Sequence, residues 1–323
     1  MGDLIMMRFL VNTCSVVLFV CLLSACMSVP TRTAGGQSPG ISAQRDIKSL
    51  HTRGLETIVE LYVYYNSTVM DCGGPQLPAV LCSGVPIRAT QNVPDGTPWE
   101  PSASSIESGG TSFSWLRQDA NFSLIPISRT NGFIFYPRMR TPTDKIGNIE
   151  VLCGFSMDGL TSYRDEQGCG ESVVYPVESR PCDIVGVTTA AQWFAKWDAA
   201  FDKMSQVCGF NLRESARDQA DRFVQVILAK HMIPDRFWVQ WNELRLATWA
   251  QGVGKDLPII AFFYGDGNAD GLAGARADQQ KYFDLYAQAI PIVRIALPAE
   301  KGGRTQFSYS DDDQAVHEKV ARR

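Results

Sequence analysis

Apolar residues recur at intervals of three and four along several stretches of the chain, which predicts amphipathic helices. These stretches are residues 46–70, 188–210, 215–232 and 277–289. In the second of them, Trp193 and Trp197 continue the spacing, and Thr188 or Thr189 is placed to cap the first turn. We interpret this aromatic stripe as core packing rather than as a cofactor site.

Shorter apolar runs bounded by Gly, Pro, Asn and Asp predict strands in the middle and in the last third of the chain. The runs are residues 79–87, 111–117, 132–137, 172–176, 242–249, 258–265, 292–298 and 305–310. Strands come first, helices follow, and strands return. This order predicts an α+β fold in which helices pack on a mainly antiparallel sheet core.

Residues 15–26 form an apolar run that ends in Leu-Ser-Ala-Cys. The run is short for a membrane-spanning helix and fits the apolar region of a signal peptide. Leucine, two small residues and cysteine resemble a bacterial lipoprotein box, so we expect residues 1–26 to be a lipoprotein-type signal in which Cys26 is lipidated. The alternative is a secretory peptide that is cleaved after Ala25 or later, without a lipid.

Residues 27–45 are rich in Gly, Ser, Pro and Thr, which is typical of a flexible tether. Residues 46–323 are then expected to form a single catalytic domain. We expect an exported protein, either an outer-membrane or cell-surface lipoprotein or a secreted one, that meets a membrane through its lipid anchor alone. The formal net charge of −4 argues against a nucleic-acid partner, which calls for a basic face.

Six cysteines follow the signal, and an even number in an exported chain predicts up to three disulfides. They are Cys72, Cys82, Cys153, Cys169, Cys182 and Cys208. We expect Cys72 to pair with Cys82 across a short loop and residues 153–182 to form a disulfide-tied excursion; the other pairings are left open. Buried free thiols are the alternative. The chain has three histidines and no close Cys-x-x-Cys pair, so a zinc site is not expected.

An arginine and a group of small hydroxyl residues stand on two consecutive predicted strands. Arg88 ends the first strand, and Thr111, Ser112 and Ser114 lie on the second, with Arg117 directly after them. A guanidinium fits phosphate oxygens two at a time, and small hydroxyls can hold a ribose without filling a cleft. This layout favours a nucleotide-cleaving site. The alternative is a surface arginine beside an ordinary half-buried strand.

Glu243 stands at the head of a later predicted strand. A fixed carboxylate there can stabilise the oxocarbenium-like transition state of N-glycosidic cleavage. Glu107 is the second candidate carboxylate, and an ordinary solvated glutamate is the alternative for either. The long polar loop at residues 91–110, which carries Trp99, is a candidate lid over the site.

These segments resemble the halovibrin family, exported bacterial proteins with NAD glycohydrolase and ADP-ribosyltransferase-like character. The resemblance covers about residues 70–310 and is carried by "VLCSGVPIRAT", "GGTSFSWLRQDANF", "TNGFIFYP", "WNELRLATW" and "LPIIAFFY". It implies an ADP-ribosyltransferase-like fold and hydrolysis of NAD to nicotinamide and ADP-ribose.

The resemblance also implies roles for particular residues. Arg88 would pair with the NAD diphosphate, Thr111 and Ser112 would position the ribose, and Glu243 would stabilise the cation. Ser114 and Arg117 would belong to the same substrate site, and Trp99 or Trp115 would stack on the nicotinamide.

Two positions depart from that pattern. Phe113 interrupts the three small hydroxyls, and Trp241 stands where a Gln or Glu usually precedes the catalytic glutamate by two places. The second departure favours hydrolysis over transfer to a protein, although a protein acceptor is left open. The alternative from another class is a non-catalytic, disulfide-stabilised surface lipoprotein that acts as a binding module.

The segment "DGNADG" at residues 266–271 resembles the first half of a calcium loop. Asp266, Asn268, Asp270 and Gly271 match, but Ala277 stands where the bidentate glutamate is required. A plain turn is therefore favoured. We expect no cofactor, with NAD as the substrate.

Overall fold

The computed structural model describes residues 39–70, 72, 79–90, 96–100, 103–125, 129–135, 150–199, 208–213, 217–230, 240–247, 259–266 and 269–316. For residues 39–49, 103, 104, 217 and 269 the description covers the backbone alone. The expected signal, including Cys26, lies outside the described residues.

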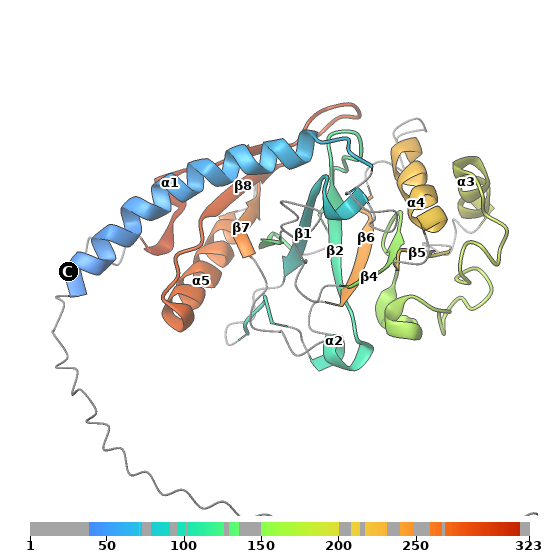
Figure 1. The fold of residues 1–323 in the computed structure, drawn as a ribbon. Coiled ribbons are helices and arrows are strands. Elements are labelled where there is room, and N and C mark those ends of the chain that lie inside the picture. Colours follow the sequence, from blue (N-terminus) through green and yellow to red (C-terminus); the bar gives the residue numbers. More distant parts are fainter. Residues whose placement is uncertain are drawn as a thin grey trace, which may run out of the picture. The chain divides into compact units, whose positions relative to one another are not determined.

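Nine strands among the described residues form one mixed sheet in the order β5-β4-β6-β2-β1-β3-β7-β8-β9 (Figure 1). Neighbouring strands are antiparallel except β7 and β8, which are parallel. The α+β class with a mainly antiparallel sheet is therefore confirmed. The strands are β1 (Val85–Thr90), β2 (Thr111–Leu116), β3 (Asn131–Phe135), β4 (Glu150–Phe155), β5 (Phe210–Asn211), β6 (Glu243–Ala247), β7 (Ile259–Gly265), β8 (Ile292–Ala296) and β9 (Gln306–Ser308).

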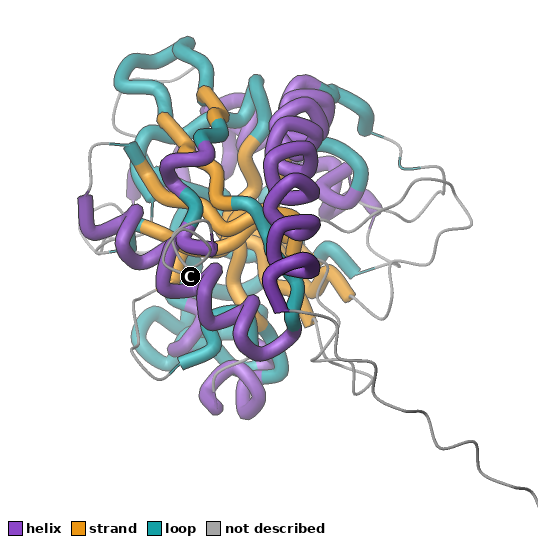
Figure 2. Tube along the Cα trace, turned by 90° about the vertical axis from the view of Figure 1, so that its left-hand side faces the viewer, coloured by secondary structure: helices purple, strands orange, loops and turns teal. Residues whose placement is uncertain are grey.

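Helices cover both faces of the sheet because its central strands are apolar on both sides (Figures 1 and 2). Ile134 of β3 packs with Leu61 of α1 (Pro39–Asn66) in one cluster. Its neighbour Phe133 packs on the other face with Tyr282 of α5 (Ala269–Tyr286). Two further helices, α3 (Ala190–Ala199) and α4 (Arg217–Lys230), pack together, and α4 covers β4 and β5. The short helix α2 (Ala103–Ser108) lies just before β2.

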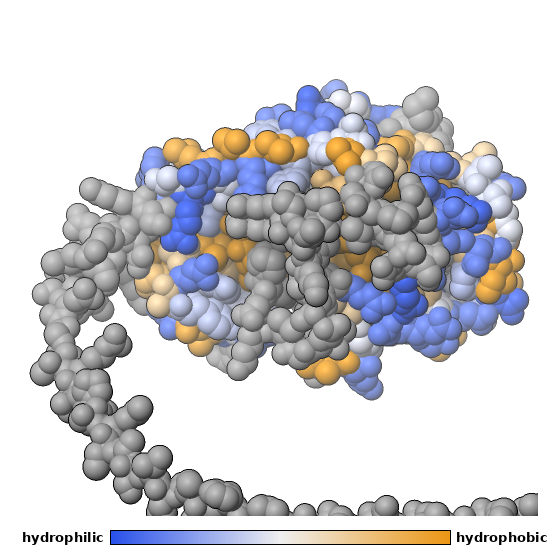
Figure 3. Space-filling model, in the orientation of Figure 1, coloured by the Kyte–Doolittle hydropathy of each residue, from blue (hydrophilic) through white to orange (hydrophobic). Residues whose placement is uncertain are grey.

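The first predicted helix is longer than expected at its start. It begins at Pro39, so residues 39–45 are helical rather than part of a flexible tether. Leu55, Val59 and Val63, spaced by four, face outward and are at least half exposed. Figure 3 shows this row of hydrophobic atoms along the outer side of α1.

The start of α3 confirms the predicted threonine cap. Thr189 Oγ1 accepts from the backbone N–H of Gln192, and Gln192 Oε1 accepts from the backbone N–H of Thr189. This reciprocal pair is a capping box, which satisfies two amide groups that the helix leaves without partners.

The secondary structure differs from the sequence predictions at four places. Residues 172–176 lie in turns rather than in a strand, and Val173 is 80% exposed. The run at 79–87 divides into a 3-10 turn (Ala79–Leu81) and β1. The chain turns between them at Gly84 with φ +73°, where a Cβ would collide with the ring of Trp115. β4 was not predicted at all, and α5 begins eight residues before the predicted start.

Three disulfides join all six of the expected cysteines, and the predicted Cys72–Cys82 pair is among them. The other two are Cys153–Cys169 and Cys182–Cys208. Disulfides of this number fit an extracellular or exported protein. Within the described part of the chain, no helix has the length and apolar character that crossing a bilayer requires.

Asp278 of α5 is a buried carboxyl that accepts a hydrogen bond from Asn131 Nδ2 at 2.9 Å. Burial raises its pKa from 3.8 to about 7, although Asn131 and Lys281 both act to lower it. Between these two pH values the folded protein holds a proton that the unfolded chain has lost. Its free energy of unfolding should therefore fall as the pH rises through this window.

Replacing Asp278 by asparagine removes this titration and keeps an oxygen that can accept from Asn131. We expect Asp278→Asn to leave stability at pH 4 nearly unchanged and to raise it at pH 8, measured by urea unfolding across the pH range. Parallel curves for the variant and the parent protein across that range would contradict this assignment.

Candidate functional site

A cavity of about 720 Å³ opens where β1 and β2 separate. The antiparallel register of these strands runs from Val85 opposite Leu116 to Ile87 opposite Ser114. Arg88 follows the last paired residue of β1, and Ser112 lies two residues before the last paired residue of β2. A cavity of this size is typical of a small-molecule site. Its described lining is largely polar and consists of Arg88, Ser105, Glu107, Ser108, Ser112, Arg129, Asp158, Leu160, Thr161, Ser162, Arg164, Trp241, Glu243 and Arg245.

The three residues predicted to carry catalysis lie together in this cavity. Arg88 comes from β1, Ser112 from β2 and Glu243 from β6. Ser112 is opposite Arg245 in the β2–β6 register, and Glu243 shares the face of Arg245 because the two are separated by one residue. The strand pairing therefore brings a hydroxyl, a guanidinium and a carboxylate to one side of the sheet.

The carboxylate of Glu243 is buried and held at both oxygens. Its Oε1 accepts from Thr161 Oγ1 at 2.9 Å, and its Oε2 accepts from the backbone N–H of Gly159 at 2.6 Å. Two donors fix the direction of the carboxylate and compensate for its loss of hydration. Each oxygen keeps a second lone pair, which can point into the cavity.

A directed chain of hydrogen bonds links Arg245 to Glu243. Arg245 Nη1 donates to Ser112 Oγ at 2.9 Å, and Ser112 Oγ lies 3.2 Å from Thr161 Oγ1. Since Thr161 gives its single hydroxyl hydrogen to Glu243, Ser112 must be the donor to Thr161. Ser112 is thus positioned by the site and keeps one lone pair for a ligand.

Arginine side chains give the lining an excess of positive charge. Four guanidiniums, those of Arg88, Arg129, Arg164 and Arg245, face three carboxylates there, those of Glu107, Asp158 and Glu243. Such a balance favours an anionic ligand, and guanidinium groups suit phosphate oxygens.

Arg88 and Arg129 have donors left for such a ligand. Arg88 Nη1 donates to the Ser112 carbonyl at 2.9 Å, and Arg129 Nη1 donates to the Ala89 carbonyl at 3.0 Å. Each makes this one hydrogen bond within the described structure. The pKa of Arg88 is lowered to about 10, mainly by burial and further by Arg129 and Arg245, so it stays charged at neutral pH.

Arg164 and Arg245 instead support the walls. Arg164 donates to the backbone carbonyls of Gly159, Gly170 and Ser179. Arg245 Nε donates to the Gln167 carbonyl, and Nη2 donates to Ser108 Oγ. These bonds and the Cys153–Cys169 disulfide tie down the segment after β4 as one wall of the cavity. The predicted disulfide-tied excursion is thereby confirmed.

Lys230 joins the segment that carries Asp158 to the segment that carries Glu243. Its buried Nζ donates to the carbonyls of Ser156 and Gln240 at 2.6 and 2.8 Å. Burial lowers its pKa to about 7. A neutral amine has two hydrogens, one for each carbonyl, so this bridge remains complete when the proton is lost.

Two of the other hydroxyls predicted for the site do not line the cavity. Thr111 lies on the face of β2 opposite to Ser112, because neighbouring side chains of a strand alternate. Its buried hydroxyl has no hydrogen-bond partner among the residues described. Ser114 shares the face of Ser112 but is buried two positions further along the strand.

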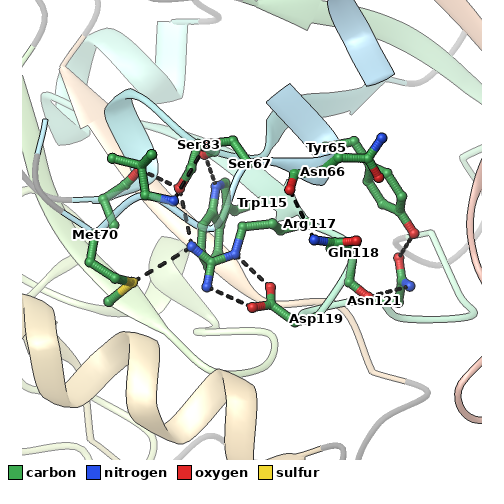
Figure 4. A network of polar contacts seen from close by, with 12 residues as sticks. Tyr65, Asn66, Ser67, Met70, Ser83, Trp115, Arg117, Gln118, Asp119 and Asn121 are labelled. Atoms are coloured by element: carbon green, nitrogen blue, oxygen red, sulfur yellow. Dashed lines mark hydrogen bonds and ion pairs between the residues drawn. The ribbon is translucent and has the colours of Figure 1, made fainter. Parts of the chain in front are cut away.

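Trp99, Trp115 and Arg117 are likewise core residues in this structure. Trp99 packs edge-on against Phe262 and Tyr282. Figure 4 shows Trp115 donating to the Ser83 carbonyl and Arg117 held between Asp119 and the Ser83 hydroxyl. None of the three is among the described lining residues. Glu107 of α2, the second candidate carboxylate, is exposed and does line the cavity.

Several lining residues were not found from the sequence. Arg245 could have been, because strand alternation places it beside Glu243. Asp158 and Thr161 belong to an irregular segment that reaches the site through the fold alone. Trp241, noted earlier as a departure from the family pattern, also lines the cavity.

The calcium-like segment has other contacts. Asp266 Oδ1 accepts from Arg294 Nη2 at 2.5 Å, and Asp270 lies in the first turn of α5. Asn268 lies outside the described residues. No cluster of three or more His, Cys, Asp or Glu side chains suited to a metal occurs in the part of the chain that the structure describes.

No protein-family model matches the chain, and comparison with curated proteins gives no match either.

Proposed function

We propose that the cavity binds NAD and hydrolyses the bond between nicotinamide and its ribose, giving nicotinamide and ADP-ribose. The observation that supports this most is the convergence of Arg88, Ser112 and Glu243, from three different strands, on one cavity. These are the anion-binding, ribose-binding and cation-stabilising groups that the reaction requires.

In this mechanism the diphosphate of NAD binds Arg88 and Arg129, which line the cavity and keep further hydrogen-bond donors. Ser112 accepts from a ribose hydroxyl with its remaining lone pair. As the C1′–N bond breaks, its electron pair leaves with neutral nicotinamide and positive charge spreads over the ribose. The fixed carboxylate of Glu243 stabilises that charge, and because it is already oriented it needs no reorganisation.

Water is the proposed acceptor of the ADP-ribosyl group. Trp241 lines the cavity two residues before Glu243, at the position where a polar side chain would assist a protein acceptor. An indole offers a single donor and no acceptor, so it cannot activate a nucleophile. Transfer to a protein is the less favoured outcome.

We further propose that the chain belongs with the halovibrins and is exported as a lipoprotein anchored at Cys26. The disulfides support export, and the motifs quoted above support the family. Metabolic labelling with a radioactive fatty acid should label the parent protein and not a Cys26→Ser variant. Equal labelling of both would exclude lipidation at Cys26.

The function is tested by incubating the purified, oxidised chain with NAD and separating nicotinamide and ADP-ribose by chromatography. We expect equimolar release of both. Binding of NAD without any release would favour the non-catalytic binding module, and neither binding nor release would reject an NAD site.

A further inference from the structure

Besides Glu243 and Glu107, the cavity is lined by the carboxyl group of Asp158, which the mechanism above leaves without a role. Asp158 lines the cavity and is partly exposed to it. One of its oxygens, Oδ1, accepts from the backbone N–H of Leu160 at 2.9 Å. Its other oxygen makes no hydrogen bond with a described residue. Asp158 therefore differs from Glu243, both of whose oxygens are already held.

The same short segment holds both carboxyl groups. Gly159 donates its N–H to Glu243, Leu160 donates its N–H to Asp158, and Thr161 donates its hydroxyl to Glu243. To do so, the chain passes through a left-handed conformation at Leu160, with φ 45° and ψ 41°. This conformation is unfavourable for a residue that has a Cβ, so the surrounding contacts must impose it.

Charged groups from three directions act on Asp158. Burial, the larger cause, and the charge of Glu243 on β6 raise its pKa. The Leu160 N–H and the guanidiniums of Arg129 and Arg164 lower it. The balance raises the pKa above 3.8, so this carboxylate takes up a proton more readily than an ordinary aspartate does.

We infer that Asp158 is the general base that removes a proton from the attacking water, a role that rests on the proposed hydrolysis. The water oxygen bonds to C1′ of the ribosyl cation while one of its O–H bonds breaks, and that proton passes to the available Asp158 oxygen. ADP-ribose leaves, and the proton is then released to solvent. Nicotinamide has already departed with the electron pair of the C1′–N bond, so charge and atoms balance.

This division of work between two carboxylates follows from their contacts. Glu243 has to stay fixed beside the developing cation, and its two hydrogen-bond donors hold it there. Asp158 has an oxygen available for a water molecule in the same cavity. General-base catalysis by a positioned side chain contributes about 10²–10⁴-fold to a rate.

The test uses Asp158→Asn and two competing fates of the ribosyl cation. In the presence of NAD and deuterated nicotinamide, the cation either captures water, giving ADP-ribose, or recaptures nicotinamide, giving labelled NAD. We expect the variant to lose about 10²-fold in hydrolysis and to show a higher ratio of exchange to hydrolysis. The ratio is independent of how much protein is folded, so partial misfolding cannot imitate it.

Azide provides a second readout because an anionic nucleophile has no proton to remove. Added azide should restore turnover in Asp158→Asn by forming the ribosyl azide, and it should have little effect on the parent protein. Asp183→Asn, the same change at an exposed aspartate outside the cavity, should behave as the parent. The inference would be overturned if Asp158→Asn kept the parent ratio of exchange to hydrolysis. This holds whether both rates are intact or both fall by the same factor. A parent protein that releases no nicotinamide would instead reject the proposed function.

Discussion

Replacing Glu243 by glutamine is expected to lower the rate of nicotinamide release by about 10²–10³-fold, the usual loss when one preorganised electrostatic group is removed. The amide is neutral and cannot stabilise the ribosyl cation as a carboxylate does. The fall should appear in kcat more than in KM, because the missing interaction forms as charge develops.

Glutamine also places a hydrogen-bond donor opposite another donor, and the effect of this contact on stability has to be measured separately. Both Glu243 oxygens accept hydrogen bonds, so the new NH₂ group must face either the Gly159 N–H or the Thr161 hydroxyl. Thr161 can turn its hydroxyl and accept instead, so the variant is expected to fold. Thermal unfolding of Glu243→Gln should be compared with that of Glu300→Gln, which makes the same change at an exposed site.

Undiminished release by a folded Glu243→Gln protein would remove Glu243 from the mechanism. Glu107→Gln then becomes informative, because Glu107 is the other glutamate among the described lining residues. Loss of activity in Glu107→Gln with full activity in Glu243→Gln would assign stabilisation of the ribosyl cation to Glu107 of α2. Loss in both would leave the electrostatic role shared.

The sequence predicted the fold best where local pattern and tertiary packing agree. β7 was found to within one residue because "IIAFFYG" is rich in β-branched and aromatic residues. β4 was missed because "EVLCGF" is short and contains glycine and cysteine, and it becomes a strand by pairing with β6. Residues 172–176 show the reverse case, since two valines and a tyrosine find no strand to pair with there.

The candidate site shows the same contrast between residues that a local pattern reveals and residues that tertiary packing places. Arg88, Ser112 and Glu243 could be chosen because each stands on a predicted strand in a pattern that has chemical meaning. Thr111 was grouped with Ser112 by composition, whereas alternation along a strand sends neighbours to opposite faces. Asp158 and Thr161 are positioned by a disulfide, an arginine and a left-handed residue, which no local pattern encodes.

Arg117 shows why a chemically suitable residue can belong to the core. Its side chain is 1% exposed, and its guanidinium lies 4.7 Å from the Trp115 ring centroid and pairs with Asp119 at 2.6 Å (Figure 4). It also donates to Ser83 Oγ at 3.1 Å, and the Ser83 carbonyl accepts from Trp115. The backbone of Trp115 in turn is bonded to the side chain of Asn242, next to Glu243. Arg117 thus supports the site from within the core.

Replacing Arg117 by methionine is expected to lower the free energy of unfolding by about 2–3 kcal/mol. Removing one partner of a buried ion pair usually costs about 3–5 kcal/mol, and less is expected here because Asp119 is 37% exposed and can be hydrated. Urea unfolding measures the loss. Arg180→Met is the matched control, since its partner Glu171 and Arg180 itself are nearly half exposed, and it should change stability by less than about 1 kcal/mol.

The activity of Arg117→Met then separates a structural role from a binding role. A core residue that does not reach the cavity should leave KM for NAD within about twofold under conditions where the variant stays folded, because substrate binding loses no direct contact. A residue bound to the diphosphate would instead raise KM by tenfold or more, since a charge-assisted hydrogen bond contributes about 1.5–3 kcal/mol. Stability that is unchanged together with a raised KM would return Arg117 to the substrate site and would require the buried network around Ser83 to rearrange when NAD binds.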